Sequence, residues 1–153
     1  MPSSDAYSTW FLDQTSLLSE LKKSQAHRGR VPIIVGYDDL RGDLQTQTNW
    51  TDGAHTIEEM AREARRQGLE YIAITDHTKG LAMTGGSDEK KLRKQMVAIE
   101  ELNAKGLGIT ILKGAEVNIN KDGTLDIDDE TLAMLDVVGV AVHAHFHLSR
   151  EAQ

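Results

Sequence analysis

The stretch Tyr71-Ile72-Ala73-Ile74-Thr75-Asp76-His77-Thr78 decides the fold class of this chain. Its apolar residues follow one another without the polar alternation of a half-buried strand, which indicates a strand covered on both faces. Residues 137–142 have the same apolar character and also lead into a histidine, His143. Helical patterns separate such strands, and this alternation predicts an α/β fold with a parallel sheet and flanking helices.

Capping signals place the elements around these strands. Thr56 and Glu59 form a capping box for a helix that ends at Gly68. A longer helix is expected over 88–105, with an apolar face at helical spacing. The other expected elements are extended segments over 42–48 and 109–119 and a short helix that ends within 132–135.

The first 30 residues differ from the rest of the chain. Trp10, Phe11, Leu17 and Leu21 recur at helical spacing, and basic residues follow them. We therefore expect a helical extension or linker over 1–30 and a second region over 31–153, which opens with a short extended run at 31–35.

Composition restricts the class of protein. The chain has 153 residues, 39% of them hydrophobic, and no apolar run approaches the roughly 20 residues that cross a bilayer. We therefore expect no membrane partner. The absence of cysteine excludes a disulfide framework and agrees with a cytoplasmic location. The net charge of −7 opposes nucleic-acid binding by bulk charge, so phosphate groups would have to meet local basic residues or bound cations.

Polar side chains follow the expected strands at their carboxyl ends, where ligands bind in parallel α/β folds. Glu116 lies between Ala115 and Val117, and an acid in such apolar company needs a partner such as a cation. Nitrogen and carboxylate ligands together suit zinc or manganese and metal-assisted hydrolysis. The polar residues at these strand ends include Gln45, Gln47, Asp52, His77, Glu116 and His143.

Two other features have plainer interpretations. His145 and His147 would share a face with His143 if the strand continued, and we expect His145 to contact phosphate or support a ligand, with His147 structural. Gly85-Gly86 is interpreted as a flexible connection, because the fuller phosphate-loop pattern is absent.

Residues 118–129 partly fit a calcium loop, but Asn118 and Asp129 stand where aspartate and glutamate are usual. The segment before them reads as strand rather than helix. A turn at Asp122-Gly123 between extended pieces is therefore the better interpretation.

The motifs at the strand ends resemble the PHP (polymerase and histidinol phosphatase) domain, most closely the C-terminal PHP domain of bacterial and archaeal family X DNA polymerases. The resemblance covers about residues 31–153, taken as the N-terminal portion of such a domain. The matching motifs are Arg41-Gly42-Asp43-Leu44-Gln45, Asn49-Trp50-Thr51-Asp52-Gly53, Ile74-Thr75-Asp76-His77-Thr78, Gly114-Ala115-Glu116-Val117 and Val142-His143-Ala144-His145-Phe146.

This resemblance implies part of a distorted seven-stranded βα barrel that holds up to three divalent ions, Mn or Zn with Mg as a further candidate, and hydrolyses phosphoesters. In the polymerases it implies a 3′-to-5′ exonuclease in DNA repair, with DNA as partner. By position, Asp52 and His77 would serve one metal, Glu116 would bridge two, and His143 would bind one of that pair. Glu116 and His143 are the implied catalytic residues, and His145 is the candidate substrate contact.

The sequence departs from the family pattern in two places. Histidine is usual at the position of Gln47, and sometimes at Gln45 as well, and an amide offers only a weak neutral oxygen. The family's later ligands would lie beyond Gln153. We therefore expect an impaired or inactive enzyme. The alternative is a metal-deficient PHP remnant with a structural or interaction role, and open sheet edges predict self-association or a domain swap.

Overall fold

A computed structural model describes residue 36 and residues 39–151. The helical extension expected over 1–30 and the extended run over 31–35 lie outside the described residues. From Leu40 onward the described residues belong to one compact unit.

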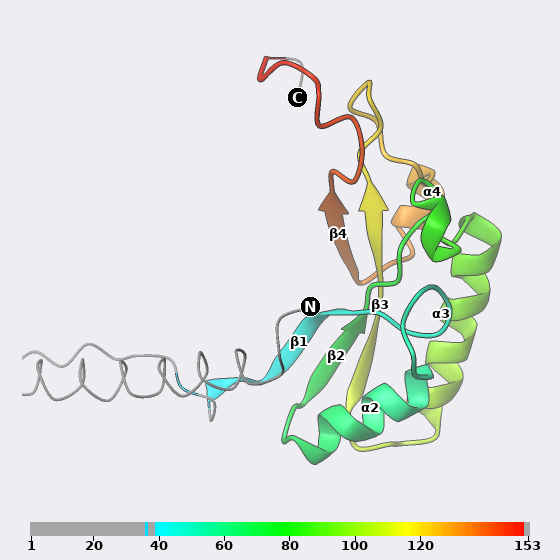
Figure 1. The fold of residues 1–153 in the computed structure, drawn as a ribbon. Helices are drawn as coiled ribbons and strands as arrows, with labels where there is room; N and C mark the ends of the chain where they lie inside the picture. The colour runs from blue at the N-terminus through cyan, green and yellow to red at the C-terminus, as the bar shows by residue number, and fades with distance from the viewer. Residues whose placement is uncertain (1–35, 37–38, 152–153) are drawn as a thin grey trace, which may run out of the picture. The chain divides into compact units, whose positions relative to one another are not determined.

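The centre of this unit is a four-stranded parallel sheet with the order β1-β2-β3-β4 (Figure 1). The first half of β3 pairs with β2, and its second half, from Gly114, pairs with β4. Such a stagger between successive strands is the geometry of a sheet that curls toward a barrel. The predicted parallel α/β architecture is confirmed, as part of a barrel. The strands are β1 (Gly42–Thr46), β2 (Tyr71–Ile74), β3 (Thr110–Asn118) and β4 (Val137–Ala141).

Three α-helices lie on one side of this sheet (Figure 1). They are α2 (Ile57–Arg66), α3 (Glu89–Ala104) and α4 (Asp129–Leu132), and a short 3-10 helix, η2 (Ala82–Thr84), precedes α3. The predicted capping box of α2 is present, and hydrogen bonds from Thr56 lower the pKa of Glu59. The predicted face of α3 is buried as expected, at Leu92, Met96, Ile99 and Leu102.

The apolar core lies between these helices and the sheet. Ile72, Ile74 and Ile111 pack with Ile99 of α3, and a second cluster joins Leu92 and Met96 to Ala115 and Val117. Because side chains alternate across a strand, the residues between these core positions point to the opposite face of the sheet. We call this opposite face the open face; it carries the candidate site.

The last strand is less covered than its apolar sequence predicts. Val138 and Val140 pair in register with Ala115 and Val117, so they lie on the helix-bearing side, yet they are 37% and 50% exposed. β4 is an edge of the described sheet, and no described helix covers these valines. The helix-bearing face of β4 is therefore more exposed than its apolar sequence suggests.

The short helix ends where the sequence predicted. α4 ends at Leu132, within the predicted range 132–135. It begins after Asp128, which caps it by accepting a hydrogen bond from the Thr131 amide at 2.6 Å.

Among the described residues, no helix is both long enough and apolar enough to cross a membrane.

Candidate metal centre

Three side chains that could bind one metal ion meet on the open face of the sheet. They are His77 after β2, Glu116 of β3 and His143 after β4, and each offers a ligand atom within 4.8 Å of the others. His143 Nε2 lies 3.0 Å from Glu116 Oε1, and His77 Nδ1 lies 3.6 Å from Glu116 Oε2. Within residues 39–151 this is the one such group of three.

The register of the sheet explains why these residues meet. Ala115 and Val117 are fully buried in the helix-packed core, so Glu116 between them points to the open face. Glu116 forms a parallel bridge with His77 on one side and pairs with Gly139 of β4 on the other. The carboxylate thus lies between the ends of two neighbouring strands, which deliver one imidazole each.

One atom of this group lacks a partner. His77 Nδ1 is buried and makes no hydrogen bond within the described structure. Buried polar atoms without partners are rare, and an ion is one explanation for such an atom. Two imidazoles and a carboxylate suit zinc or manganese better than magnesium, which prefers oxygen ligands. The side chains present therefore fit a divalent ion.

The two glutamines reach the same carboxylate, but as donors. The Nε2 atoms of Gln45 and Gln47 lie 2.5 Å and 3.1 Å from Glu116 Oε2. A carboxylate oxygen has two lone pairs, and the two amides use both. Gln45 and Gln47 therefore belong to the centre, where they bind the carboxylate and leave Oε1 facing His143.

Asp52 lies beside the group of three, on the loop after β1. Its Oδ2 atom is 3.8 Å from His77 Nε2, and its side chain is 44% exposed. The loop closes tightly because residue 53 is glycine: a Cβ there would lie 2.7 Å from the carbonyl oxygen of Gln47. Asp52 therefore faces the second nitrogen of His77.

Comparison with known proteins identifies this arrangement. Residues 43–150 match the family model described as PHP domain. The chain belongs to the PHP domain family. PHP domains are typically dependent on divalent metals, in agreement with the donor set at Glu116.

Curated relatives of this PHP domain have related names. It is 40% identical over 114 residues to "DNA polymerase/3'-5' exonuclease PolX" of Bacillus subtilis, covering 74% of this chain and 20% of the polymerase. It is 39% identical over 114 residues to a probable phosphatase of Caldanaerobacter subterraneus, covering 72% of this chain and 42% of that protein. The PHP domain thus belongs to a phosphoesterase-type family and spans less than half of these relatives.

A buried network beside the candidate metal centre was not predicted from the sequence. Asp76 is fully buried and accepts hydrogen bonds from the amide and hydroxyl of Thr48, from the Thr51 hydroxyl and from Gln95 Nε2. These bonds tie the loop that carries Asp52 to α3. One signal was available: Gln95 interrupts the apolar face of α3 one position before Met96.

His145 is not a member of the group formed by His77, Glu116 and His143. The strand does not continue through His143, His145 and His147, because β4 ends at Ala141 and His145 has a φ of 62°, so the face that they would share in such a continuation does not form. The Leu148 amide donates to the His145 carbonyl, so the chain turns here. The predicted Asp122-Gly123 turn is present, since Ile119 and Leu125 form an antiparallel bridge around it.

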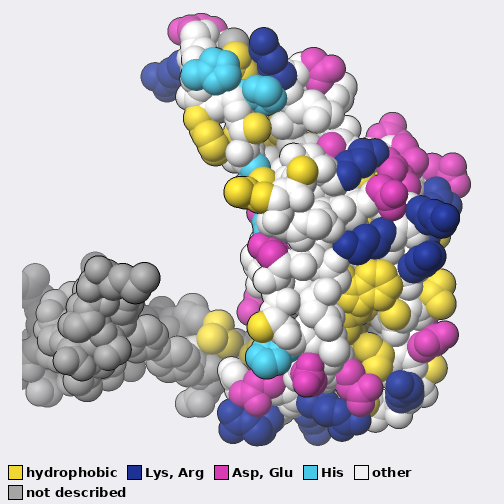
Figure 2. All heavy atoms as spheres, turned by 45° about the vertical axis from the view of Figure 1, so that its right-hand side comes forward, with side chains coloured by type: hydrophobic (Ala, Val, Ile, Leu, Met, Phe, Trp, Pro, Cys, Tyr) yellow, Lys and Arg dark blue, Asp and Glu magenta, His cyan; other side chains and the backbone are white. Residues whose placement is uncertain are grey.

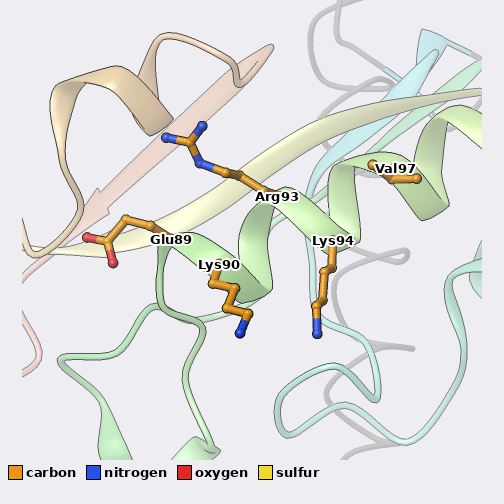
Figure 3. A pocket seen from close by; sticks show the side chains of 5 residues that line it. All are labelled: Glu89, Lys90, Arg93, Lys94 and Val97. Carbon is orange, nitrogen blue, oxygen red and sulfur yellow. The ribbon is translucent and has the colours of Figure 1, made fainter.

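A hollow of about 640 Å³ lies on the exposed side of α3, lined by residues that include Lys90 and Lys94. In Figure 3, Lys90 and Lys94 project to one side of the helix and Arg93 to the other. Figure 2 shows basic side chains mixed with acidic ones on the part of the unit that faces the viewer. This hollow is lined by no histidine and by a single acid, Glu89. It therefore lacks the combination of imidazole and carboxylate ligands that is found around Glu116.

Proposed function

We propose that this PHP domain is a divalent-metal phosphoesterase that removes nucleotides from the 3′ end of DNA. The observation that carries the proposal is the meeting of His77, Glu116 and His143 around an unpartnered buried nitrogen. The name of the Bacillus subtilis relative supports the DNA end as substrate. We also propose a role in DNA repair and a cytoplasmic location.

The residues of the centre have distinct roles in this proposal. His77 and His143 would hold the ion through neutral nitrogens, and Glu116 would supply the carboxylate oxygen. When bound, the ion lowers the pKa of a coordinated water and neutralises the phosphate that this water attacks. Gln45 and Gln47 hold the carboxylate of Glu116 in place through their amide N–H groups.

We further propose that the reaction is slow. A histidine at position 47 would offer a strong nitrogen ligand, whereas the amide of Gln47 donates to Glu116 and has only a weak oxygen to offer. Metal held on this side of the centre would therefore bind poorly. The ion is also needed for DNA binding in this proposal. A chain of net charge −7 repels a polyanion, and a bound cation would offset that repulsion locally.

The test is the release of nucleotides from a 5′-labelled single-stranded oligonucleotide in the presence of Mn²⁺. We expect slow shortening from the 3′ end, which EDTA and the Glu116→Gln substitution both abolish. Glu101→Gln, at an exposed position of α3, is the matched control and should retain full activity. Equal activity in the Glu116→Gln and wild-type chains would refute the proposal.

A phosphatase is the second candidate within the same chemistry, because the Caldanaerobacter relative is named a probable phosphatase. A small phosphomonoester such as p-nitrophenyl phosphate tests it in the same buffer. Hydrolysis of this ester without any shortening of DNA would favour the phosphatase.

A structural domain without metal is the alternative from a different class. It is favoured by the two amides, which satisfy Glu116 Oε2 without a cation. In this case the exposed edge strand β4, with Val138 and Val140, would bind a second copy of the chain. Sedimentation of a dimer, together with a lack of bound metal, would support this function; a monomer at tens of micromolar would oppose it.

A further inference from the structure

We propose that Asn118 and Asp126 are positioning residues that fix the tautomer of His143, so that its Nε2 atom presents a lone pair to the metal centre. This inference rests on the proposed function, because it concerns the same centre. Both residues are buried, with 5% and 8% of their surfaces exposed. They come from the segment that partly fits a calcium loop, and we call Asp126, Asn118 and His143 the relay.

The relay begins at Asp126, whose carboxylate is surrounded by donors. It accepts hydrogen bonds from the Thr78 hydroxyl at 2.7 Å, the backbone amide of Gly80 at 2.6 Å and the backbone amide of Asn118 at 3.0 Å. These contacts hold the carboxylate at one position below the end of β3. The side chain is therefore engaged inside the protein rather than available to calcium.

The second step fixes the side-chain amide of Asn118. Its Nδ2 atom lies 3.1 Å from Asp126 Oδ2 and 2.9 Å from the Thr78 hydroxyl oxygen. The reversed amide would set Oδ1 against the carboxylate oxygen of Asp126, and two acceptors repel each other. The Oδ1 atom must therefore point away from Asp126, toward His143.

The third step transfers this orientation to the imidazole. Asn118 Oδ1 lies 2.6 Å from His143 Nδ1. An amide oxygen can only accept, so the proton of the ring must be on Nδ1. In a neutral imidazole the other nitrogen then carries a lone pair, and the partner of one nitrogen decides the role of the other.

The result is a pair of acceptors that face each other. The Nε2 lone pair of His143 lies 3.0 Å from Glu116 Oε1. Such a contact is unfavourable unless a cation lies close to both atoms, either a metal ion or, when the ring is protonated at low pH, a second ring proton on Nε2. The relay thus prepares Nε2 for a divalent ion, in the way that outer-shell partners orient histidine ligands in metal sites generally.

The direct test is the tautomer of His143 in the full metal-free chain, measured from ring ¹⁵N shifts at about pH 9, where an ordinary imidazole is neutral. The His143→Gln variant assigns the signals. We expect the proton on Nδ1 and a lone pair on Nε2. A proton on Nε2 would overturn the proposal.

Calorimetric titration with Mn²⁺ alone provides the second readout. Asn118→Leu removes the acceptor and should weaken Mn²⁺ binding about 10- to 100-fold, the usual cost of losing an outer-shell partner. Asn118→Asp keeps an oxygen opposite His143 Nδ1, although it places a second carboxylate beside that of Asp126. This variant should bind Mn²⁺ with an affinity within about threefold of wild type. Asn120→Leu, at an exposed turn position, is the control and should bind as wild type does.

These readouts separate the relay from the proposed function. If the wild-type chain binds no Mn²⁺ and His143 still has its proton on Nδ1, the proposed function fails and the relay stands. If the wild-type and Asn118→Leu chains bind Mn²⁺ equally, the relay fails and the function stands. If Asn118→Leu does not fold, the tautomer measurement on the wild-type chain still decides.

Discussion

The two sides of the metal centre use different chemistry at the same carboxylate. On the histidine side, His143 faces Glu116 Oε1 and His77 brings a buried nitrogen without a partner. On the amide side, Gln45 and Gln47 both donate to Glu116 Oε2. The histidine side offers ligands to a cation, whereas the amide side satisfies the carboxylate without one. A parallel sheet thus positions strand-end side chains equally well whether they act as ligands or as donors.

The largest effect is expected from removing the histidine side. His143→Ala deletes a ligand, so Mn²⁺ affinity should fall by more than about 100-fold, beyond the usual cost of losing an outer-shell partner. Calorimetry measures this loss. His55→Ala, an exposed histidine ahead of α2, should leave the affinity unchanged. Retained binding in His143→Ala would place the ion elsewhere.

The buried hydrogen-bond network of Asp76 should contribute to the stability of the fold. Asp76→Asn turns one acceptor oxygen into a donor and leaves some of its four hydrogen-bond donors unsatisfied in the interior. We expect a loss of about 2–4 kcal/mol in the free energy of unfolding, measured in urea. Asp129→Asn, in the exposed first turn of α4, should change it by less than about 0.5 kcal/mol. Similar values for the two variants would contradict a structural role for Asp76.

A histidine at position 47 should make the amide side resemble the histidine side in its chemistry. Gln47→His replaces a donor amide with a nitrogen ligand, and we expect Mn²⁺ to bind about tenfold more tightly, a gain of about 1.4 kcal/mol. The rate of oligonucleotide shortening should rise as well. An unchanged affinity would mean that the identity of residue 47 does not limit the centre.

The smallest effect is expected from trimming the amide side. Gln47→Ala removes one of two hydrogen bonds to Glu116 Oε2 and no proposed ligand, so Mn²⁺ affinity should change by less than about threefold, within about 0.6 kcal/mol. A loss as large as that of His143→Ala would mean that Gln47 is a metal ligand and not only a donor to Glu116.

Much of the fold could be predicted from the sequence, because it depends on local patterns. The capping box at Thr56 and the apolar face of α3 are set by neighbours in the chain, and both were placed correctly. The exposure of β4 was not foreseen, since burial depends on what covers the strand. The turn at His145 was also missed, because the alternation of residues 143–147 resembles a strand.

The site could be predicted only in part. His77, Glu116 and His143 were found because strand ends in parallel sheets meet at one edge. The direction of the Gln45 and Gln47 amides could not be known without the structure. The relay through Asn118 was hidden for the same reason, since its residues come together only when β3 and the chain after β4 lie side by side.

The most direct test of the account is the Mn²⁺ content of the full wild-type chain after stripping and reloading, measured by elemental analysis against protein concentration. We expect close to one ion per chain, held at His77, Glu116 and His143. A chain that retains no ion after reloading would contradict it and favour the metal-free structural domain.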